Sequence, residues 1–118
     1  MLWNWSYRNP DAKITAAGTL ITKDRAADSY LITAINGFWN GAAITALEAP
    51  QSCCSPPGWN NNLLLDRSPK LDKGGFAFSV SGGVKINLFY KEGSYAFEVQ
   101  NGPEVFGGVF DAAPGDSQ

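Results

Sequence analysis

Alternation of apolar and polar residues is clearest in the last third of the chain. Between Val84 and Tyr90, every second residue is apolar, and segments 76–80 and 94–100 repeat the pattern. Successive side chains of a strand point to opposite faces of a sheet, so a period of two indicates strands with one buried face. Glycine-containing stretches separate the three segments. Residues 75–100 are therefore predicted to form an antiparallel three-stranded meander.

Weaker versions of the same pattern occur in the first half of the chain and near its C-terminal end. Asn-Gly pairs lie between several of these segments, and both residues tolerate the positive φ of tight hairpin turns. The short connection 37–41 is predicted to be a hairpin tip, and segment 24–28 could form one helical turn at most. The expected strands are 2–8, 13–23, 29–36, 42–47 and 105–110.

These segments indicate an all-β, antiparallel fold, a β-sandwich or flattened barrel of about eight or nine strands. The 118 residues suit one domain, which we expect over residues 1–111, with a flexible tail at 112–118. Thirteen glycines and seven prolines fit the frequent turns of such a fold. The expected core comprises Trp5, Leu20, Leu31, Ile44, Phe76, Phe78, Ile86, Leu88, Phe97 and Val99.

The middle of the chain, residues 48–62, has no periodicity and is predicted to be a long irregular loop. Long loops in compact domains are often functional. The loop contains the adjacent pair Cys53 and Cys54, which are candidates for redox chemistry or a disulfide. Two free thiols are the simpler interpretation; a disulfide between neighbours or a link between two chains are the alternatives.

Composition excludes several classes of function. The formal net charge is only −2, which gives no basic surface for nucleic acid or anionic lipid. No apolar run is long enough for a transmembrane helix, and Met1 is not followed by a signal-peptide pattern. Histidine is absent, which removes the commonest general base and metal ligand. No phosphate loop or dinucleotide motif occurs, so we expect no cofactor, no metal site and no enzyme.

Aromatic residues are the best candidates for contact with a ligand or partner. Phe38 and Trp39 fall at the predicted hairpin tip, and Trp59 falls in the long loop. Exposed aromatics at such positions often bind partners, although these could equally fold back over one end of the domain. The row Trp3, Trp5 and Tyr7 could stack on sugar rings, but a core stripe is the simpler interpretation.

Two further kinds of site have weaker support. Asn60, Asn61, Asn62, Asp66 and Asp72 supply oxygens of the type calcium prefers, but their spacing matches no calcium loop. A glycosidase needs two carboxylates facing each other in a cleft. The available acids are Glu48, Glu92, Glu98, Glu104 and Asp111. Of these, only Glu98 lies on a clearly alternating strand, and nothing in the sequence brings a partner to it.

Several segments together resemble a known protein family. They are the runs Trp3–Tyr7, Ile14–Leu20 and Tyr30–Gly37, then Asn40-Gly41 with Ile44-Thr45, and later Asn60–Leu64 and Asn87–Tyr90. This order resembles small β-rich bacterial proteins, common in cyanobacteria and proteobacteria, many of which carry a PEP-CTERM sorting signal. The resemblance implies an exported, surface or matrix-associated domain. It supplies no catalytic residue, and the sorting motif and its apolar helix are not in this sequence.

Three functional hypotheses follow, and the third, a carboxylate-dependent glycoside hydrolase, has the weakest support. The first is a non-catalytic structural or protein-interaction domain, such as an accessory subunit that binds another protein. The second is a domain that binds a small ligand, either a carbohydrate or a planar aromatic molecule, through aromatic side chains.

Overall fold

A computed structural model describes residues 1–54 and 58–115, which form nine strands and no helix. The long loop predicted at residues 48–62 is present between the fourth and fifth strands. The strands are β1 (Leu2–Asn9), β2 (Ile14–Ala26), β3 (Ser29–Trp39), β4 (Ala42–Leu47), β5 (Leu63–Leu65), β6 (Phe76–Val80), β7 (Val84–Lys91), β8 (Ser94–Val99) and β9 (Glu104–Pro114).

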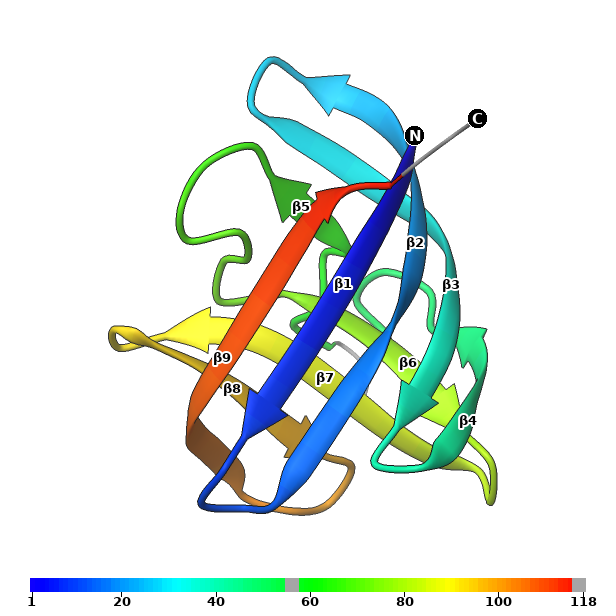
Figure 1. The fold of residues 1–118 in the computed structure, drawn as a ribbon, viewed down its shortest axis with the longest axis vertical. Coiled ribbons are helices and arrows are strands. Elements are labelled where there is room, and N and C mark those ends of the chain that lie inside the picture. The colour runs from blue at the N-terminus through cyan, green and yellow to red at the C-terminus, as the bar shows by residue number, and fades with distance from the viewer. Residues whose placement is uncertain (55–57, 116–118) are drawn as a thin grey trace.

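Eight of the strands form a closed antiparallel barrel, which confirms the predicted all-β fold. The order around the barrel is β2-β1-β9-β8-β7-β6-β4-β3, and pairing of β2 with β3 closes it. The short strand β5 is added to β3 outside this ring. Figure 1 shows β1 and β9 side by side on the front wall, with β9 ending near the start of β1.

Tight turns join most neighbouring strands because the turn residues accept positive φ. Asn40 and Gly41 between β3 and β4 have φ of 50° and 88°, and Glu92 and Gly93 between β7 and β8 have 55° and 81°. Positive φ at both central residues matches the right-handed twist of the flanking strands. Consecutive hairpins therefore cover much of the barrel, as the sequence predicted for residues 75–100.

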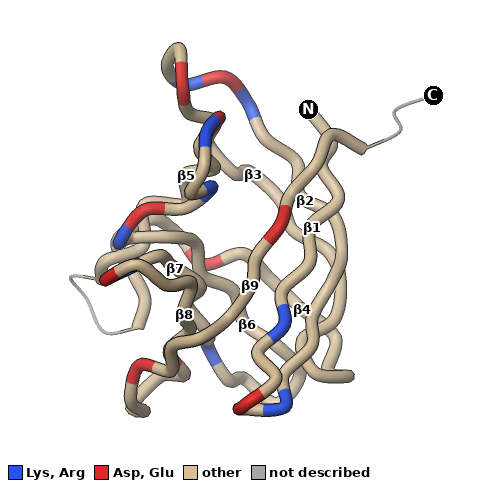
Figure 2. The backbone as a smooth tube through the Cα atoms, turned by 60° about the vertical axis from the view of Figure 1, so that its left-hand side comes forward, with Lys and Arg blue, Asp and Glu red and all other residues tan. Residues whose placement is uncertain are grey.

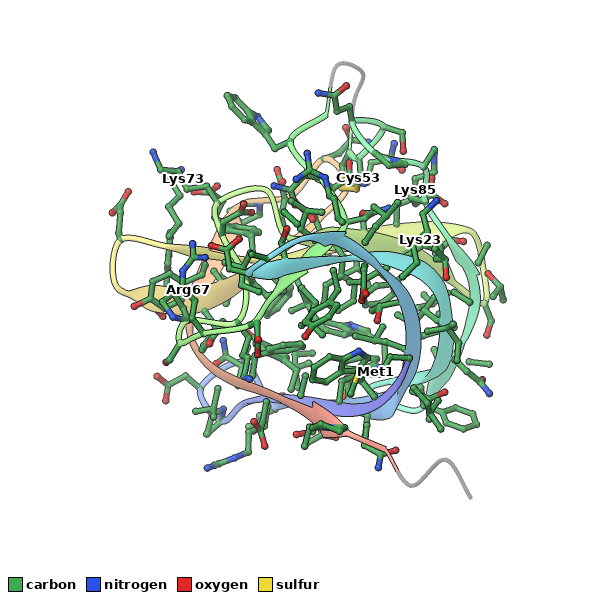
Figure 3. All side chains as sticks on the ribbon, turned by 90° about the horizontal axis from the view of Figure 1, so that it is seen from above. Met1, Lys23, Cys53, Arg67, Lys73 and Lys85 are labelled. Carbon is green, nitrogen blue, oxygen red and sulfur yellow. A yellow bond between two sulfur atoms is a disulfide. The ribbon has the colours of Figure 1, made fainter. Side chains whose placement is uncertain are left out.

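Aromatic side chains fill the barrel interior (Figure 3). Tyr7 stacks on Trp39 with ring centroids 5.6 Å apart, and Trp5 packs edge-on against Phe76 at 5.9 Å. Opposite Trp5, Gly18 approaches Gly37 so closely that an added Cβ would overlap the backbone of Asn36. The side chains of Trp3, Trp5 and Tyr7 thus belong to the hydrophobic core. The interior of the barrel is filled with side chains.

One predicted core residue lies outside, because β3 contains an extra residue. Ile21 pairs with Ala34 and Thr22 pairs with Ile32, so Thr33 is left between the two pairs as a bulge. Beyond a bulge the alternation of faces changes. Ile32 therefore points into the barrel, whereas Leu31 is only partly buried and is not part of the core cluster.

Three predicted boundaries are wrong. β3 continues to Trp39, so Phe38 and Trp39 belong to a strand and only Asn40 and Gly41 form the turn. β2 continues through Ala26, which replaces the helical turn expected at residues 24–28. β9 continues to Pro114, and Ala112 is buried in the core, so residues 112–114 are not a flexible tail. Of the rest of the expected tail, Gly115 donates its backbone N–H to the Leu2 carbonyl at 2.8 Å, and 116–118 lies outside the described residues.

Charged residues are unevenly distributed over the barrel. Figure 2 shows long stretches of β1 to β4 without charge, and a concentration of acidic and basic residues at the end of the β2–β3 hairpin and around β5. The exposed ion pair Arg67–Asp28, 3.0 Å between Nη1 and Oδ2, joins these two regions.

Candidate functional site

The long loop packs against the outside of the barrel wall. Cys53 and Cys54 are joined by a disulfide and are buried against Ala77, which faces outward from β6. Gln100, beyond β8, donates a hydrogen bond from Nε2 to the Cys54 carbonyl at 2.9 Å. Figure 3 shows Cys53 outside the ring of strands. The cysteine pair, for which free thiols were the simpler interpretation, is thus a disulfide that anchors the loop to the wall.

Asparagine side chains hold the loop in shape. Asn60 accepts the backbone N–H groups of Ser52 and Cys53 at Oδ1, at 3.0 and 2.9 Å, and donates from Nδ2 to Asn62 Oδ1 at 2.9 Å. Asn60 and Asn62 are fully buried, and buried polar groups need such partners. These oxygens are engaged inside the protein, so the asparagine run braces the loop.

Immediately before Asn60, the loop exposes the side chain of Trp59 to solvent. The Trp59 backbone N–H donates to the Cys53 carbonyl at 3.1 Å, and Gly58 lies directly against the Cys53 backbone, where no Cβ would fit. The Trp59 side chain is 79% exposed, whereas the other three tryptophans are buried. An exposed tryptophan ring on a backbone that is held in place is available for contact with a ligand or partner.

A pocket of about 250 Å³ lies beneath Trp59, between the loop side and the outer face of the sheet. Strands β7, β8 and β9 form its floor, and Lys73, which precedes β6, contributes from the same side as Trp59. Figure 3 shows Lys73 outside the barrel wall. The lining residues are Trp59, Lys73, Asn87, Phe89, Lys91, Glu98 and Glu104.

The pocket floor has a polar row beside an apolar row. Asn87 on β7 pairs with Glu98 on β8, which pairs with Glu104 on β9. Two residues along the strands, Phe89, Ala96 and Phe106 form the neighbouring row, and of these three only Phe89 lines the pocket. Both rows face outward because they alternate with interior residues such as Leu88 and Phe97. The floor therefore offers hydrogen-bonding groups on one side and hydrocarbon on the other.

Electrostatics distinguish the two carboxyl groups of the floor. Lys91 Nζ lies 3.1 and 3.2 Å from the two carboxylate oxygens of Glu104. Glu98 is half-buried and has no ion-pair partner in the described part of the chain. Burial raises the pKa of Glu98 above its usual 4.5, the negative charge of Glu104 raises it further, and Lys91 opposes both effects.

Asn87 is the least satisfied polar residue of the pocket. Its side chain is 2% exposed, and Oδ1 has no hydrogen-bond partner among the described residues. Leaving a buried acceptor unsatisfied costs roughly 1–3 kcal/mol. Such a group in a native protein calls for an explanation, and either an ordered water or a hydrogen-bond donor on a molecule that reaches it from the pocket would supply one.

The structure separates the predicted aromatic candidates. Trp59 borders the pocket, whereas Trp39 is buried in the core and stacks on Tyr7. Phe38 is 59% exposed on the outer side of β3, beside a shallow hollow that also involves Thr15 and Ala17. The three predicted residues therefore do not form one site.

Sequence reasoning missed Asn87, Glu98 and Glu104 as a group. The information was present in the turn that contains Asn101 and Gly102: a hairpin centred there places residue 98 opposite residue 104. The predicted last strand begins at residue 105, so residue 104 falls outside it and its pairing with residue 98 is not evident.

No group of three or more histidine, cysteine, aspartate or glutamate residues is placed to hold a metal ion within the described ranges. In the same residues there is no helix long and apolar enough to cross a membrane. Comparisons with protein-family models, with curated proteins and with solved structures find no match. The resemblance to the PEP-CTERM-type family thus stays a prediction.

Proposed function

We propose that this protein is a small-ligand-binding domain, and that its pocket takes a neutral, hydroxyl-rich molecule of the carbohydrate class. The observation that supports this most directly is the buried, unpartnered Asn87 Oδ1 in a pocket bordered by the exposed ring of Trp59. Binding sites for small molecules combine apolar surface with a few convergent polar groups, and this pocket has both.

The apolar part of the pocket suits the face of a sugar ring. Phe89 is buried in the floor, and Trp59 projects from the loop side. A pyranose has a C–H face that packs on aromatic rings and hydroxyl groups around its edge. The backbone of Trp59 is already held by its hydrogen bond to Cys53, so ligand binding has to order only the side-chain torsions of the indole.

The polar part of the pocket suits hydroxyl groups. Asn87 Oδ1 and the Glu98 carboxyl group can accept hydrogen bonds, and Lys73 can donate one. Lys73 and Lys91 balance the formal charges of Glu98 and Glu104, so the lining has no net charge. A neutral ligand with several donors and acceptors therefore fits better than a strongly charged one.

The test is calorimetric titration of the full chain with a panel of methyl glycosides, supported by tryptophan fluorescence. Trp59→Ala should weaken binding about tenfold, within the range of about 0.5–1.5 kcal/mol beyond area burial given by an aromatic contact. Its stability should hardly change, because the ring is 79% exposed.

The matched control is Phe38→Ala, which removes another exposed aromatic ring from outside the pocket. Its affinity should equal that of the unmodified protein. If no glycoside binds, or if both variants lose affinity equally, the proposal is wrong. In that case the interaction-domain hypothesis, tested by co-purification of a protein partner at fixed stoichiometry, becomes the better one.

A further inference from the structure

Two glutamates oppose each other across β8 and β9 in the pocket floor. Glu98 and Glu104 are paired residues of adjacent strands, and both line the pocket. Like charges directly opposite on a sheet destabilise it. Where a sequence keeps such an unfavourable local arrangement, a functional site is the usual explanation.

The surroundings of the two carboxyl groups differ in the way that acid catalysis requires. Glu104 accepts hydrogen bonds from Lys91 Nζ at both carboxylate oxygens. Glu98 lies on the more buried strand between Glu104 and Asn87, with no cation bonded to it in the described residues. Paired carboxyl groups with opposite environments commonly divide into an acid and an anion.

We propose that the pocket cleaves a glycosidic bond, with Glu98 as general acid and Glu104 as nucleophile; this inference rests on the proposed carbohydrate ligand. Glu98 gives its proton to the glycosidic oxygen, and the bond from that oxygen to the anomeric carbon breaks. The Glu104 carboxylate bonds to the anomeric carbon. Water then replaces Glu104, and its proton returns to Glu98, so the products are two free hydroxyl compounds.

The strand register is compatible with a covalent intermediate. Side chains directly opposite on antiparallel strands start from Cβ atoms about 4.5–5.5 Å apart. Glycosidases that use a carboxylate nucleophile have carboxyl groups about 5–5.5 Å apart, whereas those that activate water leave a wider gap. Glu98 and Glu104 lie opposite each other in the sheet, so the register allows their carboxyl groups to approach at the closer spacing.

The remaining lining residues have complementary positions. Asn87 continues the row Glu98–Glu104, so its free acceptor can bind a hydroxyl of the same sugar ring. Lys91 orients the Glu104 carboxylate through its ion pair, and Trp59 supports the group that leaves. The charged groups facing Glu98 in the pocket are Glu104, Lys91 and Lys73, and Glu98 is the member whose pKa is raised.

The experiment uses the full chain and a panel of nitrophenyl glycosides, with released nitrophenol as the measure of cleavage. Glu98→Gln should lower turnover by about 10²–10⁴-fold, the range for loss of a general acid, while affinity for the matching methyl glycoside stays within a few-fold. A fluorinated glycoside that slows hydrolysis of the intermediate should add one glycosyl unit to the protein mass. Glu104→Gln should abolish that addition.

The outcomes distinguish a failure of the catalytic proposal from a failure of ligand binding. If methyl glycosides bind but nitrophenyl glycosides are not cleaved and no mass is added, catalysis is excluded and ligand binding stands. If cleavage occurs but survives in both glutamine variants, the assignment of the two residues is wrong. If nothing in either panel binds or reacts, both proposals fail together.

Discussion

The two sides of the barrel wall differ in how well their buried polar groups are paired by hydrogen bonds. Inside, each buried polar atom of an aromatic residue has a partner: Trp3 Nε1 donates to Thr22 Oγ1 at 2.9 Å, and Tyr7 Oη accepts from Asn9 Nδ2 at 3.2 Å. Outside, beneath the loop, Asn87 Oδ1 has none among the described residues, and Glu98 lies opposite another glutamate.

The difference indicates a division of roles. Aromatic packing inside the barrel buries large apolar areas and supplies most of the stability. The outer pocket carries unfavourable features that this stability can offset. Side chains that break the usual rules for buried groups cluster at functional sites, so the outer face is where function is expected.

The largest effect should come from opening the interior. Phe78→Ala removes a fully buried ring that packs against Trp39, with centroids 5.7 Å apart, and against Phe76 at 5.8 Å. We expect a loss of about 3–5 kcal/mol in the free energy of unfolding, measured by urea denaturation. A loss below about 1 kcal/mol would mean that the barrel is not a packed core.

A change with the opposite sign is expected in the pocket. Asn87→Leu replaces an unpartnered buried acceptor by hydrocarbon of similar size. The free energy of unfolding should stay level or rise by up to about 1 kcal/mol, because the desolvated acceptor is gone. Glycoside affinity, measured by calorimetry, should fall about tenfold, equivalent to about 1.4 kcal/mol. Loss of stability with unchanged affinity would assign Asn87 to the structure alone.

The smallest effect concerns the pH dependence of stability. The folded chain raises the pKa of Glu98 above 4.5, so folding favours its protonated form. Ionisation therefore costs stability as pH rises through this region, and the cost is fully present at neutral pH. Glu98→Gln should be more stable than the unmodified protein at pH 7, by about 0.2–1 kcal/mol for a like-charged cross-strand pair.

The gain in stability of Glu98→Gln should shrink when the pH is lowered below the usual pKa of glutamate. The side chain at position 98 is then uncharged in both the unmodified protein and the variant. Thermal unfolding at neutral and acidic pH measures the difference. Glu92→Gln is the matched control, since Glu92 lies in the exposed β7–β8 turn away from Glu104. Equal behaviour of the two variants would show that the opposed pair carries no electrostatic cost.

Much of the fold was predictable because it depends on local rules. Alternation in segments 76–80, 84–90 and 94–100 identified three strands, and the turn residues between them fixed their antiparallel pairing. The prediction that Leu31 belongs to the core was wrong, because the alternation of apolar and polar residues does not reveal the bulge at Thr33. The prediction that Trp39 lies at a hairpin tip was wrong, because a residue next to Asn40-Gly41 can equally be the last residue of the strand. In the structure, β3 runs up to the turn and ends at Trp39.

The candidate site was predictable only in part. Trp59 stood out as an aromatic ring in a long loop, and it does border the pocket. Asn87 and Phe89 seemed to be ordinary residues on the less apolar face of a strand. The loop that covers this face approaches it through Cys53 and Cys54, and nothing local in the sequence ties those residues to Ala77.

By itself, the sequence determined that this chain is built of antiparallel strands with an aromatic core, because strand formation and turn type depend on neighbouring residues. Only the tertiary structure decided that the sheet closes into a barrel and that a loop covers one outer face. Closure and coverage depend on contacts between residues far apart in the chain, such as Ala16 with Trp39 and Cys54 with Gln100. The row Asn87–Glu98–Glu104 becomes a pocket floor only through that coverage.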